Sequence, residues 1–220
     1  MSNAPLRSAS DVNSDIAWVG SEGVALAQHS VYRKVDRLLK ARTRGRILEV
    51  GCGSGRFLDQ LRQRGWSVQG VELQPQDAEF VLQHDLTQPL PFGREFDVVL
   101  AVEVIEHLVD TDGFLRSCQS VLKPGGQLIM STPNLLFLAS RVAMLFGRRP
   151  YFAYADWHVR MFVWDDLKEK LERHFVIKRL MGSHILLGSR SGPLYPVFAW
   201  LADRLPTLAA HFIVVAQAPE

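Results

Sequence analysis

Continuous apolar runs, typical of buried strands, and apolar residues at helical spacing follow one another along this chain. Short apolar runs predict strands at 46–52, 67–73, 80–86, 96–104 and 126–134. Apolar residues spaced three and four apart predict helices at 24–42, 56–65, 110–123 and 164–175. Strands and helices therefore follow one another. This order predicts an α/β fold in which helices cover both faces of a parallel sheet.

Composition fits an ordinary globular chain. Its 220 residues, of which 47% are hydrophobic and 22% charged, suit one domain with a sizeable core. The net charge of +2 does not indicate general nucleic-acid binding. Only two cysteines are present, Cys52 and Cys118, and they do not have metal-ligand spacing. We therefore expect a reducing compartment and a cytoplasmic location.

The N-terminal residues and the longest apolar stretch bear on targeting. Residues 1–20 are mostly polar and predict a disordered leader, so the single domain is expected to span 21–220. The stretch Leu135–Phe146 has twelve residues and includes Ser140 and Arg141. It is too short and too polar to cross a bilayer, so no transmembrane segment is expected.

A glycine-rich loop follows the first predicted strand, in the sequence EVGCGSGR. Gly51, Gly53 and Gly55 let a ligand approach the backbone closely. A dinucleotide fingerprint needs glycine where Arg56 stands, and a phosphate loop needs a Gly-Lys-Ser/Thr sequence that is absent. Glu49 before the loop favours a ligand with positive charge. S-adenosylmethionine, which carries an ammonium and a sulfonium, is such a ligand.

Acidic residues end the next three predicted strands. Glu72, with Leu73 beside it, is placed to accept both ribose hydroxyls, although NAD would use the same position. Asp85 can accept the adenine amino group while the backbone N–H of Leu86 donates to the ring. The backbone carbonyl of Glu103 can receive the methionine ammonium. We predict a cofactor site composed of Glu49, Gly51, Cys52, Gly53, Gly55, Glu72, Leu73, Asp85, Leu86 and Glu103.

These motifs, in their order, resemble class I S-adenosylmethionine-dependent methyltransferases over residues 45–135. The stretch EVIEHL and the segment HVRMF at 158–162 are similar to those of ubiquinone-biosynthesis O-methyltransferases and MetW-like small methyltransferases. The resemblance implies a Rossmann-like three-layer sandwich with a seven-stranded, mostly parallel sheet. Residues 175–183 would form the sixth strand, and 211–219 would form the last, antiparallel one.

The chain departs from this family pattern between the second and third strands. Only twelve residues separate Glu72 from Asp85, and they include Pro75 and most of the third strand. The connecting helix can then be little more than a turn. We expect a thinner wall beside the adenine.

Methyl transfer needs alignment of donor and acceptor more than it needs many catalytic groups. His107 lies just past the fourth strand, where it can act as the base that takes a hydroxyl proton; alternatively, it only holds the loop. In some relatives the matching Glu-x-x-Glu-His residues hold a divalent ion. Glu103, Glu106 and His107, with His158, can do so here, but other relatives share the motif without metal, so a metal is allowed and not expected.

Two insertions outside the shared core are expected to bind the methyl acceptor. Residues 135–157 are rich in apolar and aromatic side chains and contain Arg148 and Arg149, which predicts a lid over a partly hydrophobic acceptor. Residues 184–210 form the second insertion. Both can instead complete the core or a dimer contact, which leaves monomer and homodimer open. The second insertion can also contact a membrane surface, through Tyr195, Phe198, Trp200 and Leu201.

The sequence therefore predicts an S-adenosylmethionine-dependent methyltransferase that O-methylates a small, partly hydrophobic molecule and releases S-adenosylhomocysteine. Three alternatives stay open. The chain can be a non-catalytic module that binds the cofactor, or a metal-dependent methyltransferase that acts on an RNA 3′ end. A nicotinamide dehydrogenase is the third, and Arg56 in the glycine-rich loop disfavours it.

Overall fold

The computed structural model describes residues 30–75, 78–151, 158–185 and 195–220. The predicted leader, 1–20, lies outside these ranges, and so does the beginning of the helix predicted at 24–42. Parts of both predicted insertions, 152–157 and 186–194, also lie outside them.

Seven strands in the described ranges form one sheet, in the order β3-β2-β1-β4-β5-β7-β6. Strand β7 is antiparallel to both β5 and β6, whereas the other neighbouring pairs are parallel. The predicted α/β fold with an antiparallel last strand is confirmed. The strands are β1 Arg46–Val50, β2 Ser67–Glu72, β3 Val81–Gln83, β4 Phe96–Val102, β5 Leu122–Pro133, β6 Val176–Gly182 and β7 His211–Gln217.

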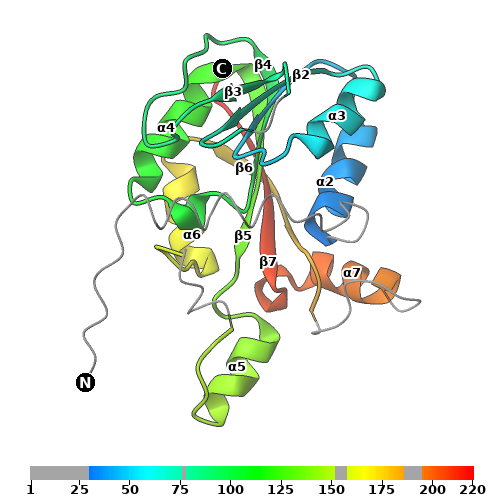
Figure 1. The fold of residues 1–220 in the computed structure, drawn as a ribbon. Coiled ribbons are helices and arrows are strands. Elements are labelled where there is room, and N and C mark those ends of the chain that lie inside the picture. The colour runs from blue at the N-terminus through cyan, green and yellow to red at the C-terminus, as the bar shows by residue number, and fades with distance from the viewer. Residues whose placement is uncertain (1–29, 76–77, 152–157, 186–194) are drawn as a thin grey trace.

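Helices cover both faces of this sheet and make three layers (Figure 1). Helices α2 (Ser30–Lys40) and α3 (Arg56–Gln63) pack on one face, and α4 (Thr111–Val121) and α6 (Trp164–Glu172) pack on the other. The remaining helical elements lie near the carboxyl ends of β4 and β5 and around β6. They are η1 Ile105–His107, α5 Leu138–Leu145, α7 Tyr195–Arg204 and η2 Pro206–Leu208.

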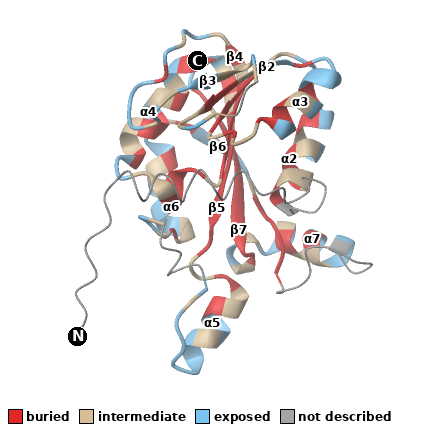
Figure 2. Ribbon diagram, in the orientation of Figure 1, coloured by how far each residue is buried: buried red, intermediate tan, exposed pale blue. Residues whose placement is uncertain are grey.

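The core explains why apolar residues follow one another in the central strands. In β1 the adjacent residues Ile47 and Leu48 are both buried, but they belong to the two clusters on opposite faces of the sheet. Figure 2 shows the buried residues concentrated along the sheet. A parallel strand covered by helices on both sides has no solvent face, so its sequence does not alternate.

Strand β5 begins earlier than the pattern predicts. The sequence predicts a turn at Pro124-Gly125-Gly126 and a strand that begins at its last residue, but the strand runs from Leu122 and contains the whole turn sequence. The register against β4 jumps from Phe96–Leu122 to Val98–Gln127, so the extra residues form a bulge. Gly125 has a φ of 71°, which supplies the left-handed residue that the bulge needs.

The connection between β2 and β3 is as short as the sequence predicts. The described residues of this segment, 73–75 and 78–80, contain bends and turns and no helix. Strand β3 is anchored directly on β2, since Val81 pairs with Gly70 and Gln83 with Glu72.

Helix α5 extends away from the sheet at the lower end of Figure 1. Its C-terminal end exposes Leu145 and Phe146, each more than three-quarters accessible to solvent. Leu138 at its start packs in a small cluster with Ile185, Ala202 and Ala209, which joins α5 to α7. None of the helices in the described ranges has the length and apolar character needed to span a bilayer.

Candidate active site

The glycine-rich loop joins β1 to α3 at the carboxyl edge of the sheet. Gly51, Gly53 and Gly55 have φ values of 67°, 53° and 69°, so all three adopt the left-handed conformation. The N–H groups of Gly51 and Cys52 donate to the carbonyl of Val71 in β2. A side chain on Gly51 would place its Cβ 2.8 Å from Val104. Glycine is therefore required here by backbone conformation and by close packing together.

Glu72 ends β2 and holds the middle of this loop. One oxygen of its carboxylate accepts a hydrogen bond from the N–H of Gly53 at 2.8 Å, and the other accepts from the N–H of Leu73 at 2.8 Å. Both backbone donors fix the carboxylate beside the loop. The predicted cofactor residues Gly53, Glu72 and Leu73 are thus brought together.

Glu49 lies beneath the loop and is buried. Its neighbour is Tyr32 of α2, whose hydroxyl donates to Glu49 Oε1 at 3.3 Å. Burial, and to a smaller extent the charge of Glu72, raise the pKa of Glu49 to about 8. The sequence did not point to Tyr32, because it precedes the motif by 17 positions and lies in a helix read only for its apolar face.

The other predicted cofactor residues are spread along the same edge. Cys52 is buried against Gly70, and burial, followed by the charge of Glu49, raises the pKa of its thiol, which disfavours a thiolate nucleophile. Asp85 Oδ1 accepts from the N–H of Thr87 at 2.9 Å, which is the turn-capping role. Leu86 packs against the core cluster of α4 and α6. Contact of Asp85 and Leu86 with adenine stays a prediction.

Glu103 follows β4 with a φ of 56°, the only left-handed non-glycine residue in the described ranges. This conformation is costly for a residue with a side chain and is typical of functional sites. Ser131 Oγ donates to Glu103 Oε1 at 2.5 Å, and His211 Nε2 lies 3.5 Å from Oε2. The carboxylate therefore points toward the start of β7.

A buried polar network continues from His211, which sequence reasoning missed. His211 Nδ1 lies 2.8 Å from the hydroxyl of Ser183, which lies 3.1 Å from His184 Nδ1. All three residues are buried, and they come from two segments, 183–184 and 211, that only the β6–β7 pairing brings together. No local sequence signal predicts this contact.

Glu106, His107 and His158 form a second group just past β4. One possible ligand atom from each lies within 4.8 Å of the others, and the imidazole rings are 5.2 Å apart. The carbonyl of Glu106 accepts from the N–H groups of Val159 and Arg160 at 2.9 and 3.0 Å, which fixes the loop that carries His158. The structure thus places His158, which the sequence also allowed, beside Glu106 and His107, and leaves Glu103 outside this group.

The environment of Glu106 is unusual for a carboxylate. Thr132 donates to Oε2 at 3.0 Å, whereas the buried Oε1 has no hydrogen-bond partner in the described ranges. Burial, with the charge of Glu103, raises the pKa of Glu106 well above its ordinary value. Oε1 of Glu106 is therefore suited to bind a ligand or a cation.

Comparison with known proteins decides the family. A family model described as a methyltransferase domain matches residues 25–174. The chain belongs to the methyltransferase-domain family. Ubiquinone biosynthesis O-methyltransferases are among the relatives of this methyltransferase. One, from Bradyrhizobium diazoefficiens, is 34% identical over 185 residues, which cover 78% of this chain and 70% of the relative. Another, from Chelativorans sp., is 26% identical over 79% of this chain and 72% of its own length.

Solved structures share the fold. The Burkholderia thailandensis 1,6-didemethyltoxoflavin-N1-methyltransferase, solved with its substrate and S-adenosylhomocysteine, aligns with a TM-score of 0.65 at 17% identity. The alignment covers 100% of this chain and 94% of that one. The arrangement of strands and helices is therefore that of a methyltransferase.

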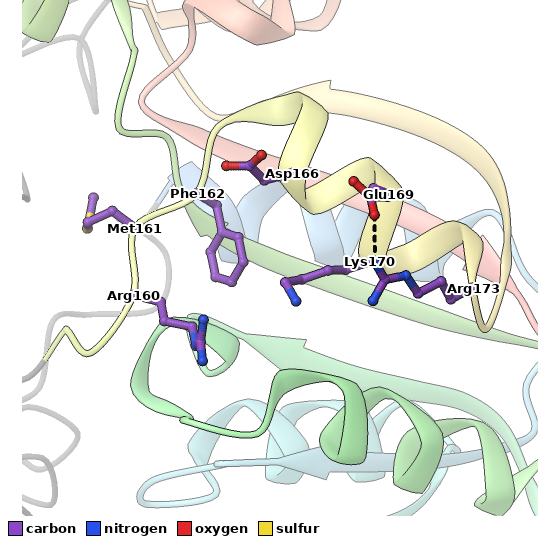
Figure 3. A pocket seen from close by; sticks show the side chains of 7 residues that line it. All are labelled: Arg160, Met161, Phe162, Asp166, Glu169, Lys170 and Arg173. Atoms are coloured by element: carbon purple, nitrogen blue, oxygen red, sulfur yellow. Dashed lines mark hydrogen bonds and ion pairs between the residues drawn. The ribbon is translucent and has the colours of Figure 1, made fainter.

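A surface pocket of about 270 Å³ lies on the outer side of the 158–162 loop of this methyltransferase (Figure 3). Its basic side chains are already engaged: Lys170 with Asp112, Arg173 with Glu169, and Arg160 with the carbonyl of Val109. Figure 3 shows α6 forming one wall of this pocket. The predicted cofactor residues and His107 do not line it. We assign it no part in the reaction.

Proposed function

We propose that this methyltransferase uses S-adenosylmethionine to O-methylate a small, partly hydrophobic molecule and releases S-adenosylhomocysteine. The glycine-rich loop with Glu49 and Glu72 would hold the cofactor. His107 would act on the acceptor hydroxyl, either as the base or as part of a group that binds it.

The observation that carries the proposal is the position of Glu106, His107 and His158. Glu106 and His107 follow β4, the strand next to β1 and its loop, and together with His158 they offer one carboxylate and two imidazoles within 4.8 Å. Glu103 lies between the glycine-rich loop and this group, because its charge raises both the pKa of Tyr32, which contacts Glu49, and the pKa of Glu106. A hydroxyl held by this group would lie on the same edge of the sheet as the cofactor residues.

The three side chains also fit a divalent ion. Among the described residues, the buried Glu106 Oε1 has no hydrogen-bond partner, and a carboxylate with two imidazoles suits Mn²⁺ better than Mg²⁺. When bound, such an ion would polarise the acceptor oxygen. The residues of this chain would orient the ion and exclude water around Glu106. This arrangement favours the ligand role of His107 over the role of free base.

The acceptor class is supported by the surroundings and by relatives. Helix α5 exposes Leu145 and Phe146 and is followed by Arg148 and Arg149, which suits an apolar molecule with an anionic group. Relatives at up to 34% identity are named for O-methylation in ubiquinone biosynthesis. We therefore propose a phenolic hydroxyl as the methylated group. The second insertion can extend this contact to a membrane surface.

The decisive experiment measures S-adenosylhomocysteine formation with a dihydroxybenzoate as the probe acceptor, with and without EDTA. If His107 is a ligand, EDTA abolishes turnover, Mn²⁺ or Mg²⁺ restores it, and Glu106→Gln and His158→Ala are as damaging as His107→Ala. If His107 is a free base, activity survives EDTA and His107→Ala lowers turnover by about 10²–10⁴-fold.

Two results would change the assignment. A chain that binds the cofactor tightly but transfers no methyl group to phenols or to RNA 3′ ends would be the non-catalytic module. Transfer to a short RNA with a free 3′ end, and not to phenols, would favour the metal-dependent RNA alternative. Monomer or homodimer and a cytoplasmic location remain predictions, which gel filtration with light scattering and cell fractionation can test.

A further inference from the structure

A row of polar side chains runs along the edge of the sheet where β4 and β5 end. The row is made of Glu103 after β4, Ser131 in β5, His211 at the start of β7, and Ser183 and His184 after β6. These four strands are neighbours in the order β4-β5-β7-β6. The row therefore begins close to the candidate acceptor group and ends where the second insertion begins.

Glu103, at the first end of the row, is held by contacts on both oxygens. Ser131 Oγ accepts from the N–H of Glu103 at 3.1 Å and donates to its Oε1 at 2.5 Å, while Oε2 lies 3.5 Å from His211 Nε2. The left-handed φ of 56° is a costly conformation that these contacts maintain. The side chain of Glu103 is 25% exposed, whereas that of Glu106 is 1% exposed. A ligand at this edge can therefore reach the carboxylate of Glu103.

The contacts beyond Glu103 can be satisfied by hydrogen bonds in two directions. Ser183 Oγ accepts from the backbone N–H of His211 at 3.1 Å and lies 2.8 Å from its Nδ1 and 3.1 Å from His184 Nδ1. In one direction His211 Nδ1 donates to Ser183 and the hydroxyl of Ser183 donates to His184, which leaves His211 Nε2 without a proton.

In the other direction His184 donates to Ser183, and Ser183 donates to His211 Nδ1. The Nε2 atom of His211 then carries the proton that faces Glu103. A change from the first direction to the second moves one proton away from Glu103 without moving any heavy atom. The row is therefore built to accept a proton from this carboxylate.

Methylation of a hydroxyl needs a group that takes the hydroxyl proton. If His107 binds the acceptor as a ligand, as the geometry favours, the nitrogen that faces the acceptor cannot also take this proton. Glu106 is buried and belongs to the same group of three side chains. Glu103 lies outside that group but close enough for its charge to raise the pKa of Glu106. Its carboxylate is the exposed acid beside the acceptor group that has a histidine behind it.

We propose that Glu103 is the base that takes the proton of the acceptor hydroxyl, and that His211, Ser183 and His184 carry this proton away. The acceptor O–H bond breaks as oxygen bonds to the methyl carbon, and the S–CH₃ bond breaks with its electron pair left on sulfur. The proton goes to Glu103, then to His211 Nε2, and reaches solvent before the next turnover. Glu103 is the catalytic residue, and His211 and Ser183 are positioning residues. The inference rests on the proposed O-methylation.

The test compares two acceptors that differ in whether a proton has to be removed. Slightly above neutral pH the hydroxyls of dihydroxybenzoate keep their protons, as phenols generally do, whereas a nitrocatechol is largely ionised. Glu103→Gln keeps the size of the side chain but is not a base. It should lower turnover of dihydroxybenzoate by about 10²–10⁴-fold and change turnover of the nitrocatechol far less. Affinity for S-adenosylhomocysteine, measured by calorimetry, should be unchanged.

A second variant tests the row behind Glu103. His211→Gln can still donate a hydrogen bond but cannot pass a proton between two ring nitrogens. It should lower turnover of dihydroxybenzoate by roughly 10–10²-fold, the loss expected for a hydrogen bond to a charged group, and should again spare the nitrocatechol. His174→Gln is the matched control, because His174 pairs with Asp112 away from this edge. It should change turnover of neither acceptor.

A third variant keeps the test independent of Glu103→Gln. Glu103→Ala leaves space where the carboxylate stood, and added formate should partly restore its turnover of dihydroxybenzoate. Circular dichroism checks that each variant is folded. The response of Glu103→Gln to EDTA and to Mn²⁺ should match that of the wild type, because a base is not a ligand.

Several results would overturn the inference. Equal losses with both acceptors would show that Glu103 only supports the loop, and a raised Mn²⁺ requirement in Glu103→Gln would make it a ligand. A loss in His107→Ala that disappears with the nitrocatechol would make His107 the base. In each case the wild type still methylates phenols, so the proposed function stands. A wild type that methylates neither phenol would contradict the proposed function and the inference with it.

Discussion

The two halves of the candidate site are built in different ways. The cofactor half gathers most of its residues from one short segment, since β1, the glycine-rich loop, α3 and β2 lie between Arg46 and Glu72. The acceptor half joins Glu106 and His107 to His158, which lies about fifty positions further along the chain. Local backbone geometry therefore fixes the first half, whereas loop packing on a completed sheet fixes the second.

This difference predicts that changes in the cofactor half abolish binding, whereas changes in the acceptor half leave binding intact and lower turnover. The largest effect should come from Gly53→Val. Gly53 has a φ of 53° and donates its N–H to Glu72, so a branched side chain strains the loop and displaces that bond. We expect S-adenosylmethionine binding to weaken by more than about a thousandfold, measured by calorimetry.

The matched control is Gly93→Val, since nothing lies within 4 Å of a Cβ built at Gly93. It should bind the cofactor normally. If folded Gly53→Val binds as well as the control, the loop does not hold the cofactor.

The next largest effect concerns the acceptor half. His158→Ala removes one of the three grouped side chains without touching the glycine-rich loop. We expect turnover to fall by roughly 10²-fold, with cofactor affinity changed less than about twofold. Steady-state kinetics and calorimetry on the same preparation measure the two quantities.

His174→Ala is the control for His158→Ala, because His174 pairs with Asp112 on the α4–α6 side of the sheet. Its turnover should stay near that of the wild type. Equal losses in both variants would indicate a general effect on stability, and a loss of cofactor affinity in His158→Ala would contradict the separation of the two halves.

A smaller effect is expected from Glu72→Ala. The variant lacks the carboxylate, so the ribose hydroxyls lose their charged hydrogen-bond acceptor. Cofactor binding should therefore weaken by roughly 1.5–3 kcal/mol. Because Glu72 also binds the N–H of Gly53, the ribose contribution needs a double-mutant cycle with a cofactor analogue that lacks the 2′-hydroxyl. Loss of this hydroxyl should matter in the wild type and not in the variant.

Glu95→Ala, which changes an exposed acid paired with Arg46, is the control for Glu72→Ala. A loss below about threefold in Glu72→Ala would indicate that its carboxylate only supports the loop.

The smallest functional effect is expected away from both halves, where α2 is joined to α7. Lys34 of α2 is buried, and its ammonium binds the carbonyls of Gly182 and Ala199 and the carboxylate of Asp203 in α7. Lys34→Met should lower the free energy of unfolding by about 2 kcal/mol, because Asp203 and two carbonyls lose their donor. Urea denaturation measures it, and activity at low temperature should remain.

Lys40→Met is the control, since Lys40 is exposed and pairs with Asp36 on the same helix. Its stability should change by less than about 0.5 kcal/mol. If Lys34→Met and Lys40→Met have the same free energy of unfolding, the contacts of Lys34 do not stabilise the packing of α2 against α7.

Much of the fold could be predicted because its signals are local. Apolar runs placed β1 to β5, the family resemblance placed β6 and β7, and the glycine spacing placed the loop between β1 and α3. The bulge in β5 could not be predicted, because a Pro-Gly-Gly sequence such as Pro124-Gly125-Gly126 is typical both of a turn after a helix and of an interruption within a strand. Pairing of β5 with β4 and β7 decides between these outcomes.

The sequence by itself determined the alternation of strands and helices, the left-handed glycines and the acid at the end of β2. These features depend on backbone conformation and on neighbours a few residues away. Only the tertiary structure decided that Tyr32 reaches Glu49, that His158 joins His107, and that His211 meets Glu103. Each of these pairs joins segments far apart in the chain, and its distance is fixed only when both segments have packed on the sheet.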